Sequence, residues 1–235
     1  MGTLDQDILL GLGEEGESTQ VSSAALESHL VALEDRYTAL SADASILDKA
    51  KIELEMARVK IGLNENEEAA TSARQLIDTF IQNSEWELAA EACDTIFLAG
   101  KDNALVALGQ GIWLAVSYPI NPELTLKMLQ HVVDDTPDDA DGAAVAAAVG
   151  VYIVDLRTEG EQHKNLIFFA NQLLGAVARR HSDIDSPDKF NFWLEKLQLT
   201  DPDKILVRLR NVIDVLVQDD WWFDRDELRQ QLPVN

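Results

Sequence analysis

The feature that most constrains this chain is a pair of almost uncharged segments near its centre. They run from Ala104 to Ile120 and from Gly142 to Leu156, with the sequences ALVALGQGIWLAVSYPI and GAAVAAAVGVYIVDL, and neither contains Lys, Arg or Glu. A helix that is apolar on all sides is covered on all sides by protein or by lipid. Each segment is shorter than the roughly 20 apolar residues that a membrane span requires. We therefore expect both segments to be inner helices of a helical protein.

The first of these segments contains a GQG sequence and two large aromatic residues. Gly109 to Gly111 lies inside an apolar helix without the preceding strand that a dinucleotide-binding loop needs, so it indicates close helix packing. Trp113 and Tyr118 each carry one polar atom, which usually needs a partner when the ring is buried. We interpret both rings first as core residues and alternatively as the lining of a small-molecule pocket.

From Ser22 onward the chain has helical periodicity, because apolar residues recur at steps of three and four. In the first helix this stripe consists of Leu26, Leu30, Leu33, Tyr37 and Leu40. We find about ten helices, joined by connections of roughly three to eight residues, and no convincing strand pattern. The predicted fold class is therefore all-α, with antiparallel helices stacked as helical hairpins into an α-solenoid. An irregular α-helical bundle is the alternative.

Residues that begin or end helices mark the connections. Prolines preceded by polar residues are expected to open three helices, at Asn121-Pro122, Ser186-Pro187 and Asp201-Pro202. Ser84, with Glu87 three residues later, matches a capping box. We expect Gly62 to end the second helix in a left-handed turn, and Asp138 or Asp141 to cap the helix that follows the acidic turn.

We divide the chain into three parts. Residues 1–21 are expected to be a flexible acidic tail, residues 22–218 a helical-repeat domain, and residues 219–235 a C-terminal cap segment with aromatic and acidic residues. The first residues, MGTLDQ, lack the positive charge that begins a secretory signal, and the apolar patch after them is short. This start predicts a cytoplasmic location.

The formal net charge of −23 limits the partners, since 42 residues are acidic and 19 are basic. Such a charge repels nucleic-acid phosphates and anionic lipids. We therefore expect no nucleic-acid partner and no membrane partner. Solubility is the simplest explanation of the acidity, and a protein partner with a basic surface is the functional one.

The sequence contains no recognisable pattern for catalysis, a cofactor or a metal. Cys93 is the only cysteine, which excludes an intramolecular disulfide and a cysteine zinc site. The four histidines lie on separate predicted elements. DDADG in the acidic turn resembles the centre of a calcium-binding EF-hand loop, but Pro137 and Ala148 occupy the loop positions one and twelve, where ligands are required. We expect no catalytic, cofactor-binding or metal-binding residues.

One surface feature remains, in the sequence QDDWWFDRDEL near the C-terminus. Trp221, Trp222 and Phe223 are adjacent and cannot all face one helix stripe, and aspartates lie on both sides of them. One interpretation is a plug over the end of the helical stack. The other is an anchor for a partner, because Trp and Arg dominate interface hot spots and Arg225 is close by. We name these four residues as the candidate partner-binding site.

The helix-turn-helix rhythm advances by about 34 to 42 residues per pair, and in this respect the chain resembles tetratricopeptide-type repeat proteins. Between Ser45 and Asp138, Ala57 and Ala69 fall where this family has small residues, and Pro137 resembles its closing proline. Trp113 falls at a small-residue position, and no window carries the full set of tryptophan, leucine, glycine and tyrosine. The resemblance implies a protein-binding scaffold without catalysis of its own.

Two functions from different classes follow. The first is a non-enzymatic adaptor or assembly factor that presents an acidic helical surface to a protein partner. The second is an enzyme or small-molecule-binding domain with a pocket near Trp113 and Tyr118.

Overall fold

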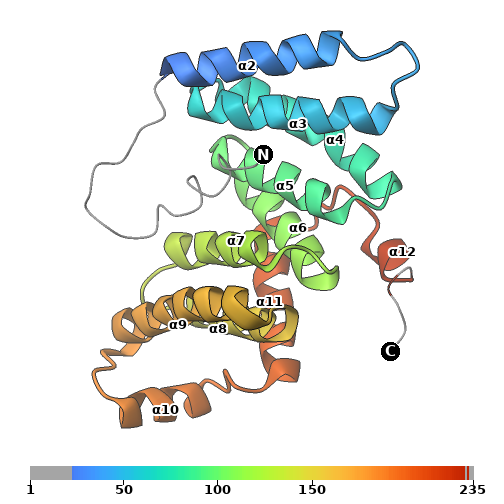
Figure 1. The fold of residues 1–235 in the computed structure, drawn as a ribbon. Helices are drawn as coiled ribbons and strands as arrows, with labels where there is room; N and C mark the ends of the chain where they lie inside the picture. Colours follow the sequence, from blue (N-terminus) through green and yellow to red (C-terminus); the bar gives the residue numbers. More distant parts are fainter. Residues whose placement is uncertain (1–22, 231, 233–235) are drawn as a thin grey trace.

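Each helix packs against the next one along most of the chain (Figure 1). The structure is a computed structural model that describes residues 23–230 and 232; the predicted tail of residues 1–21 lies outside this range. The described residues form eleven helices and no strand, which confirms the all-α prediction. The helices are α2 (Ser23–Thr38), α3 (Ile46–Gly62), α4 (Asn66–Gln82), α5 (Trp86–Leu98), α6 (Ala104–Ser117), α7 (Pro122–Asp135), α8 (Asp141–Arg157), α9 (Gly160–Ser182), α10 (Pro187–Lys196), α11 (Pro202–Val217) and α12 (Arg225–Gln230).

Neighbouring helices form a continuous stack. Contacts join each neighbouring pair from α2 to α9, and α3 also touches α5 as α7 touches α9. Helix α11 breaks this order, because it returns to the middle of the stack and packs on both α6 and α8. Figure 1 shows α11 running across the direction of α7, α8 and α9.

The two uncharged segments form the buried centre of the protein, as the sequence predicts. Every residue from 107 to 115 of α6 is buried, and so is every residue from 143 to 150 of α8. Helix α6 is covered by α5, α7 and α11, whereas α8 is covered by α7, α9 and α11. These contacts explain why neither helix has a polar face.

The two glycines of the GQG sequence are close-packing positions, in agreement with the sequence interpretation. A Cβ atom added to Gly109 would lie 2.7 Å from Val217 of α11. One added to Gly111, on the other side of α6, would collide with Met128 of α7 and lie 2.8 Å from Cys93 of α5. Helix α6 therefore touches three helices at distances that only glycine permits.

Two connections contain a left-handed residue that the sequence does not predict. These residues are Asn64 (φ 63°) and Ser84 (φ 58°), so Ser84 is not the N-cap of α5. In both turns the next N–H bonds back to a helical carbonyl, from Glu65 to Lys60 and from Glu85 to Phe80, at 2.9 Å. This is the Schellman arrangement, with a left-handed residue after each helix.

Gly62 does not form the left-handed turn that the sequence predicts. It is the last residue of α3, and Asn64 makes the left-handed turn in its place. A Cβ atom on Gly62 would lie 2.8 Å from Leu26 of α2. The glycine therefore lets α2 approach the end of α3.

Helix starts follow the sequence prediction where a polar residue precedes proline. Asn121 accepts a hydrogen bond from the N–H of Glu123, and Ser186 accepts one from the N–H of Lys189. The prediction for α8 is wrong, because Ala140 is its N-cap and neither aspartate caps it. Asp141 is instead the first residue of α8 and forms ion pairs with other helices. No helix in the described part of the chain is long and apolar enough to cross a membrane.

The tight contacts of α6 predict an unusual response to alanine. Gly111→Ala should lower the free energy of unfolding by about 1 to 3 kcal/mol, because the overpacking outweighs the higher helix propensity of alanine. Urea unfolding measures this change. Gly175→Ala is the matched control, since Gly175 also lies within a helix and its nearest neighbour would be 3.5 Å away. That variant should be as stable as the parent or more stable, and equal stability of the two variants would contradict the packing argument.

Candidate functional site

The candidate site is formed by the chain after α11, which folds back onto the middle of the stack (red in Figure 1). We call residues 219–230 the C-terminal segment. Gln218 and Asp219 adopt the left-handed conformation, with φ of 50° and 68°, and so reverse the chain direction after Val217. The segment then lies against α6, a central helix of the stack, and its Trp222 contacts Arg74 of α4.

An aromatic cluster holds the start of this segment on α6. The Trp113 ring lies 6.2 Å from the Trp221 ring and 5.5 Å from the Phe223 ring, measured between centroids. Trp113 itself is only 5% exposed. Aromatic pairs at such distances contribute about 0.5 to 1.5 kcal/mol each beyond the area that they bury. Trp221, Trp222 and Phe223 remain half-buried.

A second contact fixes the end of the segment. The buried Tyr118 hydroxyl donates a hydrogen bond of 3.0 Å to the Leu228 carbonyl. Its ring stacks on Trp86 of α5, with centroids 4.0 Å apart. Burial raises the pKa of Tyr118 above its ordinary value, so the hydroxyl stays protonated and remains a donor. The polar atom of Tyr118 thus has the partner that its burial requires.

Gln110 clamps the backbone at the start of the segment, beside the aromatic cluster. This residue is fully buried in α6. Its side-chain oxygen accepts a hydrogen bond of 2.8 Å from the Trp222 N–H, and its side-chain nitrogen donates one of 3.3 Å to the Asp220 carbonyl. The amide is one of the few side-chain groups that can donate and accept at once, as this backbone requires.

Two arginines lie over the indole rings. The Arg74 guanidinium on α4 is 4.4 Å from the centre of the Trp222 ring, and that of Arg225 is 3.8 Å from the centre of the Trp221 ring. Arg225 also pairs with Asp214 of α11 at 3.0 Å. Each cation–π contact contributes about 0.5 to 2 kcal/mol, depending on how far it is desolvated.

We call the resulting patch the aromatic–arginine surface. The structure brings together all four residues named from the sequence, and it adds one that sequence reasoning missed. Its members are Arg74, Trp221, Trp222, Phe223 and Arg225. Gln110 was also missed as a contact of the segment, although one polar residue within an apolar helix is a signal that could have indicated it. The patch lies over the central helix α6 and extends to α4.

The rings proposed for a small-molecule pocket are packed together. Trp113 and Tyr118 lie 6.3 Å apart between centroids, and the C-terminal segment covers both. Protein side chains therefore occupy the space around these two rings. The small-molecule alternative stays a prediction.

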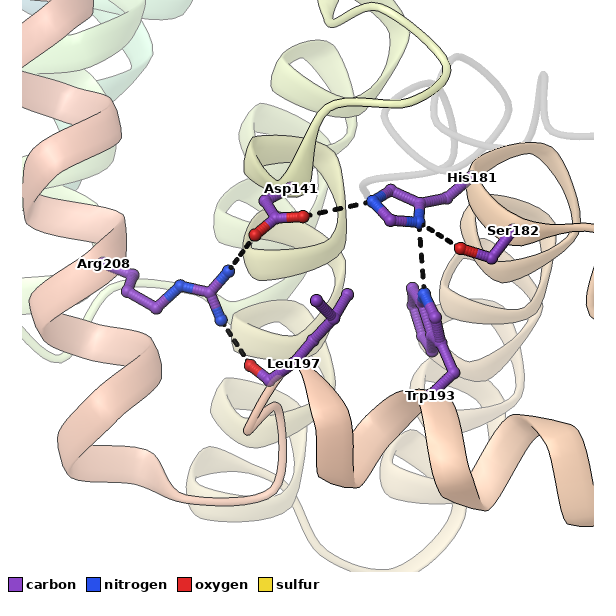
Figure 2. A network of polar contacts seen from close by, with 6 residues as sticks. All are labelled: Asp141, His181, Ser182, Trp193, Leu197 and Arg208. Atoms are coloured by element: carbon purple, nitrogen blue, oxygen red, sulfur yellow. Dashed lines mark hydrogen bonds and ion pairs between the residues drawn. The ribbon is translucent and has the colours of Figure 1, made fainter.

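A polar network elsewhere joins four helices (Figure 2). Asp141 of α8 lies 3.2 Å from Nε2 of His181 and 3.0 Å from Nη2 of Arg208. On the other side of the imidazole, the Trp193 indole N–H lies 3.3 Å from Nδ1, and the Ser182 hydroxyl lies 2.6 Å from the same atom.

Serine, histidine and aspartate meet in this network, but its geometry is that of a structural joint. Because an indole N–H can only donate, Nδ1 of neutral His181 must be the acceptor, and Nε2 then carries the proton toward Asp141. Ser182 and Trp193 compete for one lone pair. Arg208 neutralises Asp141 and also donates to the Leu197 carbonyl, which fastens α11 to the end of α10. The network holds α8, α9, α10 and α11 in register.

A separate, buried polar group joins α5 to α7. Asp94 is 6% exposed, and its carboxylate lies 2.9 Å from Lys127 Nζ and 3.3 Å from Nε2 of His131. Burial alone would raise the pKa of Asp94, but His131 and Lys127 together outweigh it and hold the pKa below its ordinary value. The Asp94 side chain is therefore an anion that ties the two helices together.

Other chemistry-bearing residues are placed apart. Cys93 is buried at the α5–α6 contact, and burial raises the pKa of its thiol to about 12. It is therefore neither an exposed nor an activated thiol. In the described part of the chain, no group of three or more His, Cys, Asp or Glu side chains could hold a metal ion.

The clamp predicts that Gln110→Met loosens the C-terminal segment while preserving the volume of the side chain. The Trp222 N–H and the Asp220 carbonyl lose their partners, so the free energy of unfolding should fall by about 1 to 3 kcal/mol. Trypsin should also cut faster after Arg225 and Arg229. Gln172→Met, at an exposed position of α9, is the control. Unchanged proteolysis of the Gln110 variant would show that the clamp does not hold the segment.

The Asp94 group predicts a stability difference that depends on pH. Asp94→Asn should cost about 2 kcal/mol at neutral pH, because Lys127 loses its buried counter-ion and His131 loses the carboxylate beside its Nε2. A carboxylate with a lowered native pKa stabilises the fold above its unfolded pKa of about 3.9, and this contribution is lost as the pH falls through the native pKa.

Denaturant unfolding of the parent and of the Asp94→Asn variant should therefore give free energies that converge below about pH 4. Asp185→Asn removes a carboxylate whose pair with Lys189 is exposed, and it should have a smaller effect. A difference that stays constant from neutral to acidic pH would contradict the role of the Asp94 charge.

Comparisons with known proteins do not assign this chain to a family. No protein-family model matches the sequence, and comparisons with curated proteins and with solved structures find no match either. The resemblance to tetratricopeptide-type repeats therefore stays a prediction from the sequence.

Proposed function

We propose that this chain is a non-enzymatic adaptor or assembly factor whose aromatic–arginine surface contacts a partner protein. The observation that carries this proposal is the set of three adjacent half-buried rings with two arginines stacked on them. Tryptophan and arginine are the residues most enriched at interface hot spots. Their remaining exposed area is available to a partner.

The surface is held in place before any partner arrives. Gln110 fixes the backbone at Trp222, and Trp113 packs against the rings on either side of it. A binding surface that is already ordered loses little conformational entropy on association. This arrangement therefore supports a binding role for the same contacts that fasten the segment to α6.

The charge around the surface favours a basic partner. Asp219, Asp220 and Asp224 are exposed beside the rings, and the whole chain carries a formal net charge of −23. Electrostatic attraction at such a surface raises the association rate and weakens with added salt. A partner with a positive surface would gain from both effects.

The experiment is an affinity capture from native extract with the full chain as bait, at low and at high salt, followed by mass spectrometry. We expect a stoichiometric protein partner that high salt releases. Trp222→Ala should weaken its capture by about tenfold, the effect of removing a hot-spot residue that contributes roughly 1.4 kcal/mol. Phe192→Ala is the matched control, because Phe192 is an exposed ring on α10, 67% exposed and outside the surface.

Circular dichroism and urea unfolding must show that the Trp222 variant is folded at the temperature of the assay. A partner captured equally by the parent and by a folded Trp222 variant would place the interface elsewhere. A bound small molecule that co-purifies without any protein would contradict the adaptor function.

A further inference from the structure

A groove at the N-terminal end of the stack lies between α2, α3 and α4, with a volume of about 570 Å³. Tyr37 contributes from α2, Met56 from α3 and Gln75 from α4. Cavities of about 300 to 1,000 Å³ are the size that binds a small ligand or one large side chain with its neighbours. The groove is therefore large enough for a specific occupant.

Helix α4 separates this groove from the C-terminal segment. Gln75 lines the groove, whereas Arg74, its neighbour in sequence, faces Trp222. Successive residues of a helix point about 100° apart, so Arg74 and Gln75 lie on different faces of α4. One face of α4 contacts the C-terminal segment through Arg74, and the other borders the groove.

The charges in the open groove favour a cation. Glu34 and Glu53 both line it, and the Tyr37 hydroxyl donates a hydrogen bond of 2.8 Å to Glu53. Lys60 also lines the groove, but its ammonium lies 2.7 Å from Glu68, which neutralises it. The formal charges of these residues, which are the three carboxylates of Glu34, Glu53 and Glu68 and the ammonium of Lys60, add up to −2.

We propose that this groove binds an arginine or lysine side chain from a basic segment of the partner protein. The positive head group would lie between Glu34 and Glu53, where charge-assisted hydrogen bonds form, and the aliphatic stem would lie on Met56. This inference rests on the proposed function and names the chemistry of the partner. It uses a site on the other side of α4 from the aromatic–arginine surface.

Two features argue for a side chain of a protein rather than for other occupants. The carboxylates repel phosphates, which disfavours nucleotides and nucleic acid. Polar groups of Ser72 and Gln75 line the groove beside the carboxylates, so an apolar ligand would displace their water without replacing its hydrogen bonds. A long cationic side chain matches both the charge and the single apolar wall.

The test measures the fluorescence anisotropy of a short labelled arginine-rich peptide with the full chain. A matched peptide carries citrulline in place of each arginine, which keeps the shape and removes the charge. We expect the arginine peptide to bind and the citrulline peptide not to bind. The double variant Glu34→Gln with Glu53→Gln should weaken binding of the arginine peptide by about tenfold or more.

The control double variant is Glu27→Gln with Glu55→Gln. It removes the same formal charge from the same two helices, α2 and α3, at positions outside the groove. We expect it to bind the arginine peptide within about twofold of the parent, since Glu27 and Glu55 do not line the groove and exposed charges without a direct contact contribute little. Equal weakening by both double variants would mean that peptide binding depends only on the overall charge, and this result would contradict the groove proposal.

The remaining outcomes separate this inference from the adaptor function. If Trp222→Ala abolishes peptide binding and the groove variants do not, the basic segment binds at the aromatic–arginine surface and the groove proposal fails. If spermidine occupies the groove and the arginine peptide does not bind, the occupant is a free polyamine and the proposal fails as well. Groove binding without any protein captured from extract would instead overturn only the adaptor function.

Discussion

The close contact of α6 with its neighbours is the constraint on which the rest of the structure depends. Gly109 lets α11 approach one side, and Gly111 lets α5 and α7 approach the other. Gln110 lies between them and is fully buried, yet both ends of its amide are hydrogen-bonded to the C-terminal segment. A glycine in a helix interior costs about 1 kcal/mol relative to alanine. The close packing of α5, α7 and α11 on α6 offsets that cost, because each contact adds dispersion attraction and removes apolar area from water.

How a helix ends decides what its last carbonyls bind. Where a left-handed residue follows the helix, as at Asn64 and Ser84, backbone N–H groups return to the final carbonyls in the Schellman pattern. Where the chain leaves in an extended conformation, as after α6 and α7, the Schellman pattern is absent, and arginines bind carbonyls of the last turn. Arg157 donates to Ala115 and Val116, and Arg180 donates to Val133. Positive charge at these positions also complements the helix dipole. Each of these two arginines therefore caps one helix and also joins it to the helix that carries the arginine.

Periodicity predicted the helices well, and it predicted long-range contacts poorly. The apolar stripes indicated an all-α stack, because burial imposes a 3.6-residue period on any helix with one apolar face. The lack of charge on every side of α6 and α8 indicated that they lie at its centre. The turns at Asn64 and Ser84 were missed, since a left-handed asparagine or serine is uncommon and is stable here only with Schellman bonds. The contact of Gln110 with Trp222 spans 112 residues, and the one polar residue in an apolar helix signals a buried partner without identifying it. Trp221 to Phe223 were recognised as unusual, but their support from Arg74 and Trp113 exists only in three dimensions.

The use of arginine inside the fold has a consequence for the surface. Arg157 and Arg180 cap helix ends, Arg208 joins α10 and α11, and Arg74 and Arg225 stack on tryptophans. Arg157, Arg180 and Arg208 are thus committed to contacts within the fold, whereas Arg74 and Arg225 belong to the aromatic–arginine surface. Acidic residues are rarely buried without a partner, so a partner meets a predominantly acidic surface. Long-range attraction would bring a basic partner to many parts of this surface, so specificity must come from sites with defined shape, where carboxylates lie beside an apolar wall or where rings and arginines are held in place.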